Sequence, residues 1–182
     1  RPIERIPFQW SIHHLKSDGE LSHFEYLADG AYDPRRELAE RLLDVLDHEE
    51  MPILAYHAPF ERGVIQELAD LFTDLAPRLE ALIARLGDPL PIVRSHTYYP
   101  GYKGSFSLKA VAPTLVPELD YDALDGVAGG LEASAAFWSI AGGSVTNADE
   151  IDRLRRELLD YCRMDTEALM KVHLELRSLG GL

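Results

Sequence analysis

The chain has 182 residues, 46% of them hydrophobic, which is enough to bury a core of ordinary size. It carries 31 acidic and 18 basic residues, and its net charge of −13 argues against broad electrostatic adhesion to nucleic acid or to an anionic membrane. The single cysteine, Cys162, excludes an intrachain disulfide and a zinc site built on cysteines. We find no apolar run of about 18 residues and nothing like a signal peptide, so we expect a cytoplasmic protein that does not span a membrane.

Alternating apolar residues predict a β-hairpin in the first part of the chain. Residues 8–15 and 22–27 both alternate, and the turn-forming pair Asp18-Gly19 lies between them. A short apolar strand is expected at 51–56. Helical periodicity predicts three helices in this half, over residues 34–49, 59–72 and 76–86.

The second half of the chain is predicted to be mainly helical. Residues 87–104 are interrupted by prolines and glycines, so we expect an irregular loop there. Asn147 or Asp149 should cap a final long helix. Three smaller features complete the pattern, namely a short helix capped by Ser107, a break at 126–130 and a helix over 131–140. Strands mixed with helices in this way indicate an α/β or α+β domain.

The last helix carries an acidic residue on its apolar stripe. Steps of three or four residues along the stripe reach Tyr161 and Asp165. A carboxylate facing the interior needs a hydrogen-bonding partner, a cation or a raised pKa. A bound metal ion is one such partner, and the Tyr161 hydroxyl one turn away could position a water molecule. The apolar members of the stripe are Ile151, Leu154, Leu158, Leu169, Val172 and Leu176.

A second acidic residue is predicted to face inward where the strand at 51–56 meets the next helix. Glu61 begins a line on that helix that continues through Ile65 and Leu68. The end of a sheet strand is the usual place for an active site in an α/β protein. Two inward carboxylates on different helices suggest one shared site for a hard cation such as Mg²⁺ or Mn²⁺.

Both acidic segments resemble motifs of one superfamily, the DEDD group of DnaQ-like 3′–5′ exonucleases. Tyr161-Cys-Arg-Met-Asp165 resembles the third motif in its tyrosine form, Tyr-x-x-x-Asp. His57-Ala-Pro-Phe-Glu61 resembles the second motif, usually Asn-x-x-Phe-Asp. The chain departs from this second pattern twice, because His57 stands in place of Asn and Glu61 in place of Asp.

An uncharacterised bacterial family of predicted nucleases within this superfamily resembles the chain more closely. It has Phe-Gln-Trp-Ser, Tyr-Asn-x-x-Phe-Glu and Gly-Ser-Phe-Ser-Leu-Lys segments in this order. The corresponding residues here are 8–11, 56–61 and 104–109, so the resemblance covers nearly the whole chain.

The resemblance implies a ribonuclease H-like α/β fold, with a mixed sheet flanked by helices. The first motif of the superfamily, Asp-x-Glu on the first strand, should precede Phe8. Residues 1–7 contain only Glu4 as an acid. We therefore expect residues 1–182 to form a single DnaQ-like domain that is N-terminally trimmed and lacks its first strand.

The activity that the resemblance implies is phosphodiester hydrolysis with two metal ions, held about 4 Å apart. Asp165 would bind the metal ion that activates water, and Tyr161 would orient that water. Glu61 would support the second ion, and both ions would be Mg²⁺ or Mn²⁺. The expected substrate is the 3′ end of single-stranded DNA or RNA.

Four further residues are candidates for contact with the substrate. The resemblance places His57 and Phe60 beside it. Lys103 and Lys109 are candidates for phosphate contacts because of their charge and their position in the chain.

Other interpretations of the same residues stay open. The chain could be a catalytically inactive copy of the fold that binds nucleic acid or protein, or an unrelated metal-dependent phosphohydrolase that acts on small nucleotides. Asp165 could pair with an arginine or a backbone amide. Glu61 could be a first-turn acid favoured by the helix dipole, and His57 could be a buried core histidine.

Overall fold

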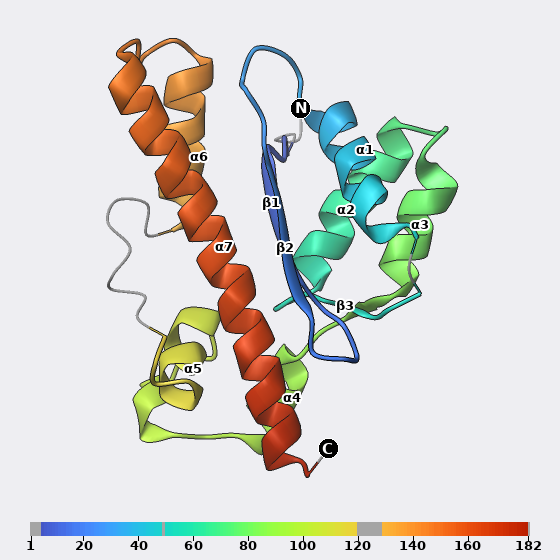
Figure 1. The fold of residues 1–182 in the computed structure, drawn as a ribbon, viewed down its shortest axis with the longest axis vertical. Coiled ribbons are helices and arrows are strands. Elements are labelled where there is room, and N and C mark those ends of the chain that lie inside the picture. Colours follow the sequence, from blue (N-terminus) through green and yellow to red (C-terminus); the bar gives the residue numbers. More distant parts are fainter. Residues whose placement is uncertain (1–4, 49, 120–128, 182) are drawn as a thin grey trace.

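The structure is a computed structural model that describes residues 5–48, 50–119 and 129–181. It contains both helices and strands, so the predicted α/β class is confirmed (Figure 1). Three expectations fall at least partly outside the described residues. These are the N-terminal stretch that lacks the Asp-x-Glu motif (residues 1–4), the predicted helix end at Glu49, and most of the predicted break at 126–130.

The predicted hairpin is confirmed. Strands β1 (Gln9–Leu15) and β2 (Leu21–Leu27) pair antiparallel, with Gln9 opposite Leu27 and Leu15 opposite Leu21. Gly19 permits the tight turn because its φ of +89° is one that glycine adopts at little cost. The Gly19 N–H donates to the Lys16 carbonyl at 3.0 Å.

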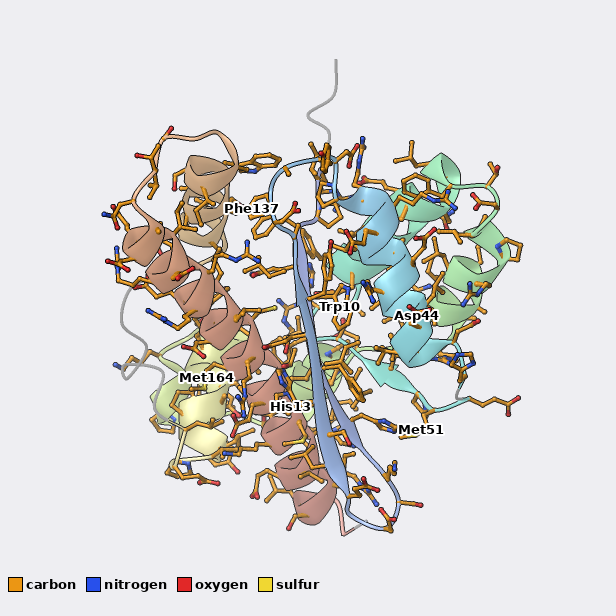
Figure 2. All side chains as sticks on the ribbon, turned by 45° about the horizontal axis from the view of Figure 1, so that its top comes forward. Trp10, His13, Asp44, Met51, Phe137 and Met164 are labelled. Atoms are coloured by element: carbon orange, nitrogen blue, oxygen red, sulfur yellow. The ribbon has the colours of Figure 1, made fainter. Side chains whose placement is uncertain are left out.

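Three helices lie on one side of the hairpin (Figure 1). They are α1 (Arg35–Leu46), α2 (Pro59–Leu71) and α3 (Ala76–Ala84), which confirm the three predicted helices. Figure 2 shows Trp10 between the hairpin and α1, and its indole N–H donates to the Leu38 carbonyl at 3.3 Å. The buried residues of this cluster are Leu38, Ala39, Leu43, Leu68, Ala69, Leu75, Leu79 and Leu82.

The long helix α7 (Ala148–Leu179) crosses the other side of the hairpin (Figure 1). Helix α6 (Gly130–Ala141) lies beside its first half and α5 (Leu108–Leu115) beside its second half. Of the two predicted caps for α7, Asn147 is the one observed, and its side chain accepts the Glu150 N–H at 3.0 Å. In the described part of the chain, no helix combines the length and the apolar character needed to cross a bilayer.

A second, smaller sheet lies below α2. Strand β3 (Ile53–Leu54) pairs parallel with β4 (Leu86–Gly87), and the Ile53 and Ala55 N–H groups donate to β4 and its preceding residue. Within the described ranges, the strands therefore form two separate two-stranded sheets.

The expectation of an irregular loop over 87–104 is wrong for most of that stretch. Helix α4 (Leu90–His96) and a 3₁₀ turn, η1 (Pro100–Tyr102), lie within it. Pro91 is compatible with α4 because it occupies the first turn, where a backbone N–H has no helical partner. Ser107 precedes α5 at the predicted cap position, but its side chain makes no capping hydrogen bond.

A polar network joins the hairpin to α7. Ser11 Oγ lies 2.8 Å from His23 Nε2 and 2.9 Å from Thr166 Oγ1. His13 Nδ1 also lies 2.9 Å from Thr166 Oγ1, and Figure 2 shows His13 between the hairpin and α7. The two imidazole rings are 4.6 Å apart. These contacts attach α7 to the hairpin at Thr166, the residue that follows Asp165.

Burial lowers the pKa of both His13 and His23. The proximity of His23 lowers the pKa of His13 further. The charged side chains that face this pair are Glu25, Arg163, Glu167 and Lys171.

We expect acid to destabilise the fold partly through this histidine pair. The unfolded chain takes up the protons first as the pH falls below about 6.5, because the folded pKa values are lower. Urea unfolding at pH 7.5 and 5.5 should show a smaller loss of stability in a His13→Gln/His23→Gln variant than in the wild type. His48→Gln, at an exposed position, is the control. Equal losses in all three proteins would contradict a role of the pair.

Candidate functional site

One cleft, with a volume of about 1950 Å³, brings most of the predicted site residues together. It lies between the hairpin, β3 and residues of helices α1, α2, α5 and α7. Its lining includes both predicted metal ligands, Glu61 and Asp165, although they are separated by 104 positions in the chain. The other predicted residues that line it are His57, Phe60, Lys109 and Tyr161.

Glu61 lies in the first turn of α2, as the helix-dipole interpretation also expects. Its Oε2 atom is buried and has no hydrogen-bond partner among the described residues. Burial raises the pKa of this carboxyl group, and the negative charge of Asp88 raises it further. The backbone amide of Glu61 and the side chain of His57 act in the opposite direction. A buried carboxylate oxygen in this state is stabilised by a proton or by a cation.

Tyr161 and Asp165 are half-buried on successive turns of α7. Burial raises the pKa of Tyr161 well above its ordinary value, and the charge of Asp165 and a hydrogen bond to it raise it further. Tyr161 therefore keeps its proton and presents it toward Asp165. The Lys109 ammonium lies 4.7 Å from the centre of the Tyr161 ring, so a positive charge adjoins this pair.

Asp88 holds the turn, or corner, between β3 and α2, although we assigned it no role from the sequence. One carboxylate oxygen accepts the His57 N–H at 3.0 Å and the Leu90 N–H at 2.9 Å. The other oxygen accepts the Ala58 N–H at 3.1 Å. Asp88 directly follows β4 and precedes a proline. This turn-forming pattern is the feature of the sequence from which its role could have been predicted.

His57 occupies that corner with a left-handed backbone, at φ = +69°. Asn, Asp and His are the residues, after glycine, that most often adopt such angles. The motif that the segment resembles has Asn here, so the substitution keeps a residue suited to the turn. His57 is exposed, and the interpretation of it as a core histidine is therefore wrong.

Phe60 and Lys103, two of the proposed substrate contacts, lie in different places. Phe60 is 56% exposed at the cleft, with the Arg5 guanidinium 5.6 Å from its ring centre. Lys103 is exposed, ends the η1 turn with φ = +50°, and does not line the cleft. The structure thus does not bring Lys103 together with the other candidates.

The charge balance of the cleft is opposite to that of the whole chain. Its lining includes six lysines and arginines and two acids, Glu61 and Asp165. The whole chain has 18 basic and 31 acidic residues. Two of the six basic side chains of the lining are in ion pairs with acids outside it, Arg5 with Glu67 and Lys16 with Glu20. The six basic residues are Arg5, Lys16, Arg85, Arg94, Lys109 and Arg177.

No group of three or more His, Cys, Asp or Glu side chains that could hold a metal ion occurs among the residues the structure describes. Glu61 and Asp165 therefore provide two carboxylates, not a complete ligand set from the protein. Cys162 also lines the cleft, and burial raises its pKa to about 12, so its thiol stays protonated near neutral pH.

A family of unknown function includes this chain. The family model described as Domain of unknown function (DUF2779) matches residues 1–107, more than half of the sequence, so the chain belongs to this family. The matched part includes the hairpin, Glu61 and Asp88, and it ends before α7. No curated protein and no solved structure matches the chain significantly.

We expect Glu61→Gln to raise the free energy of unfolding at pH 7. The substitution removes a buried charge whose folded pKa is raised, so ionisation of Glu61 destabilises the fold as the pH rises through that value. At about pH 4 the wild-type carboxyl is largely protonated in both states, and the difference should shrink. Urea unfolding at the two pH values measures this.

The control for this prediction is Glu80→Gln, at an exposed position on α3. It should leave stability nearly unchanged at pH 7. A Glu61→Gln protein that is less stable than the wild type at pH 7 would show that the charged form of Glu61 stabilises the fold.

Proposed function

We propose that the chain forms part of a metal-dependent 3′–5′ exonuclease that hydrolyses phosphodiester bonds of DNA or RNA. The observation that carries this proposal is the position of Glu61, Tyr161 and Asp165 in one cleft. They come from the two segments that resemble the second and third exonuclease motifs. The unpartnered Glu61 oxygen and the basic lining of the same cleft add support.

The order of the elements supports a ribonuclease H-like fold. An antiparallel hairpin is followed by a helix, and then by two parallel strands with helices between them. This is the order that remains when the first strand of such a fold is left out. The long helix α7 then carries the segment that resembles the third motif.

Glu61 and Asp165 fit a divalent cation, because both are carboxylates and one buried oxygen of Glu61 has no hydrogen-bond partner among the described residues. Mg²⁺ commonly binds one or two carboxylates and takes its other ligands from water and substrate phosphate. Bound Mg²⁺ or Mn²⁺ would stabilise negative charge on the attacking and leaving oxygens of the phosphate ester.

The other residues of the cleft have roles that follow from their charge and exposure. Tyr161, which keeps its proton, can donate a hydrogen bond and so orient a water molecule beside Asp165. Lys109 places a positive charge where a phosphate would approach. Phe60 is exposed enough to stack on a base at the end of a single strand.

A catalytically inactive binding module is the second candidate function. It is favoured by one observation, namely that no cluster of three potential metal ligands occurs within residues 5–48, 50–119 and 129–181. The basic cleft and the exposed Phe60 would serve binding equally well without catalysis.

We expect Asp165→Asn to lower the Mn²⁺-dependent exonuclease activity of the full-length protein by about 100-fold or more, because it removes a negative charge from the metal site. Single-stranded DNA and RNA oligonucleotides labelled at the 3′ or the 5′ end would give the direction of digestion. The control is Asp160→Asn, at an exposed position on the same helix.

The outcomes of this assay separate the candidate functions. Unchanged activity in Asp165→Asn would overturn the proposed role of this residue. Binding of oligonucleotides without digestion by the wild type would favour the inactive module. Hydrolysis of free nucleotides alone would favour a phosphohydrolase of another class.

We expect Mn²⁺ to raise the thermal unfolding midpoint of the wild type and to have a smaller effect on Glu61→Gln. A ligand at 100 times its dissociation constant stabilises the folded state by about 2.7 kcal/mol. Differential scanning fluorimetry with Mn²⁺, and again after addition of EDTA, measures this without an activity assay. Glu80→Gln should respond as the wild type does, and an equal response of Glu61→Gln would exclude Glu61 as a ligand.

A further inference from the structure

One stretch of this acidic chain contains no acidic residue. Residues 89–117 have neither Asp nor Glu, although about one residue in six of the whole chain is acidic. The same stretch carries three basic residues, Arg94, Lys103 and Lys109. Neither Arg94 nor Lys103 forms an ion pair with any residue that the structure describes. A polyanion can therefore approach this stretch without repulsion from acids of its own.

Two tyrosine rings are exposed in the middle of this stretch, between α4 and α5 (Figure 1). Tyr98 is 73% exposed and Tyr99 39%, and Lys103 is exposed as well. Tyr99 and Lys103 are the two residues that flank the single turn of η1. The two rings and the ammonium group therefore belong to one short segment, and we call Tyr98, Tyr99 and Lys103 the tyrosine platform.

A buried tyrosine holds this platform in place. Tyr102 is fully buried, and the centre of its ring lies 5.6 Å from that of Tyr99 and 5.9 Å from that of Phe106, in edge-on contacts. Its hydroxyl oxygen lies 3.0 Å from Thr97 Oγ1, and its backbone N–H donates to the Tyr99 carbonyl at 3.0 Å. An exposed ring on a backbone that is already ordered loses little conformational entropy when a ligand stacks on it.

The platform adjoins the cleft without lining it. Arg94, on one side of the platform, and residues 104–109, on the other, belong to the lining, whereas residues 95–103 do not. Lys109, which adjoins Tyr161, is one of these lining residues. A chain-like ligand bound at the candidate site can therefore extend onto the platform.

We infer that the tyrosine platform binds single-stranded nucleic acid outside the cleft, with a base stacked on Tyr98 and a phosphate at Lys103. The inference rests on the proposed function for the class of ligand, and it adds a second binding surface to that site. Each nucleotide of a single strand combines a flat base with one negative charge, and the platform offers a ring and a positive charge within one turn. Every base has a π-face, so this binding is independent of sequence.

An acidic peptide is the competing ligand, because it would also match the positive charge of the platform. The exposure of Tyr98 favours nucleic acid over such a peptide. A flat base covers a planar ring more completely than a carboxylate or aliphatic side chain does.

Fluorescence anisotropy of the full-length protein in EDTA measures binding without hydrolysis. The probes are a labelled oligothymidylate of about twelve nucleotides and a strand of the same length whose sugars carry no bases. We expect Tyr98→Ala to weaken binding of the oligothymidylate about tenfold and to leave binding of the abasic strand unchanged, because only bases stack. Tyr32→Ala is the matched control, since Tyr32 is 85% exposed and lies outside residues 89–117.

The salt dependence of binding separates the charge of the platform from its rings. Lys103→Gln should weaken binding of both strands and reduce the slope of log affinity against log salt concentration by about 0.7, the value for one phosphate contact on a single strand. Tyr98→Ala should leave the slope unchanged, because it removes no charge. Arg156→Gln is the control for Lys103→Gln, since it removes an exposed positive charge from the first half of α7.

Three results would overturn the inference. They are the absence of binding in EDTA, unchanged affinity of Tyr98→Ala for the oligothymidylate, and an equal loss for the two strands in that variant. A polyglutamate that depends on Tyr98 more strongly than the oligothymidylate does would assign the platform to a protein partner instead.

The platform and the nuclease activity can fail separately. Digestion of the oligothymidylate in Mn²⁺, together with unchanged affinity of Tyr98→Ala in EDTA, would reject the platform and support the nuclease. Binding that depends on Tyr98, without digestion in Mn²⁺, would support the platform and reject the nuclease.

Discussion

The three hydrogen bonds accepted by Asp88 hold the corner from which the candidate site is built. They fix two successive N–H groups at the start of α2 and one at the start of α4, and so set the direction of α2 relative to the small parallel sheet. His57 tolerates the left-handed backbone that this corner requires. Glu61 follows within one turn, and its buried, unpartnered oxygen is a direct consequence of where α2 begins. A charge-assisted cap of this kind is worth about 1.5–3 kcal/mol per hydrogen bond, more than most surface contacts.

The other half of the site depends on α7, which is positioned by different forces. Its buried residues Leu158 and Val172 join two separate hydrophobic clusters, and Thr166 ties the helix to the hairpin through Ser11 and His13. Tyr161 and Asp165 lie between these anchors. The hairpin is therefore a common support, because α7 packs on one of its sides and the hydrophobic cluster that includes α2 lies on the other.

The sequence predicted the elements with strong periodicity and the acids that lie on them. The hairpin, α2 and α7 follow from alternation, apolar stripes and caps, and the inward position of Glu61 follows from the same pattern. The α4 helix was missed because prolines were treated as breakers, although Pro91 occupies a first-turn position. The separation of the strands into two sheets, the position of Lys103 outside the cleft and the three bonds of Asp88 depend on contacts between distant segments, which a local pattern does not contain.

The electrostatics of the cleft connect its chemistry with its fold. The cleft lining combines six basic side chains with the carboxylates of Glu61 and Asp165, both of which are partly buried. Burial already raises the pKa of Glu61, so its unpartnered oxygen lowers stability unless a cation or proton is bound. Several of the surrounding basic side chains are already engaged elsewhere, because Arg5 pairs with Glu67, Lys16 pairs with Glu20, and Arg85 donates to the Leu46 carbonyl. An acid left unneutralised in this way lowers the stability of the isolated fold, a feature that is more common at functional sites than elsewhere in a protein.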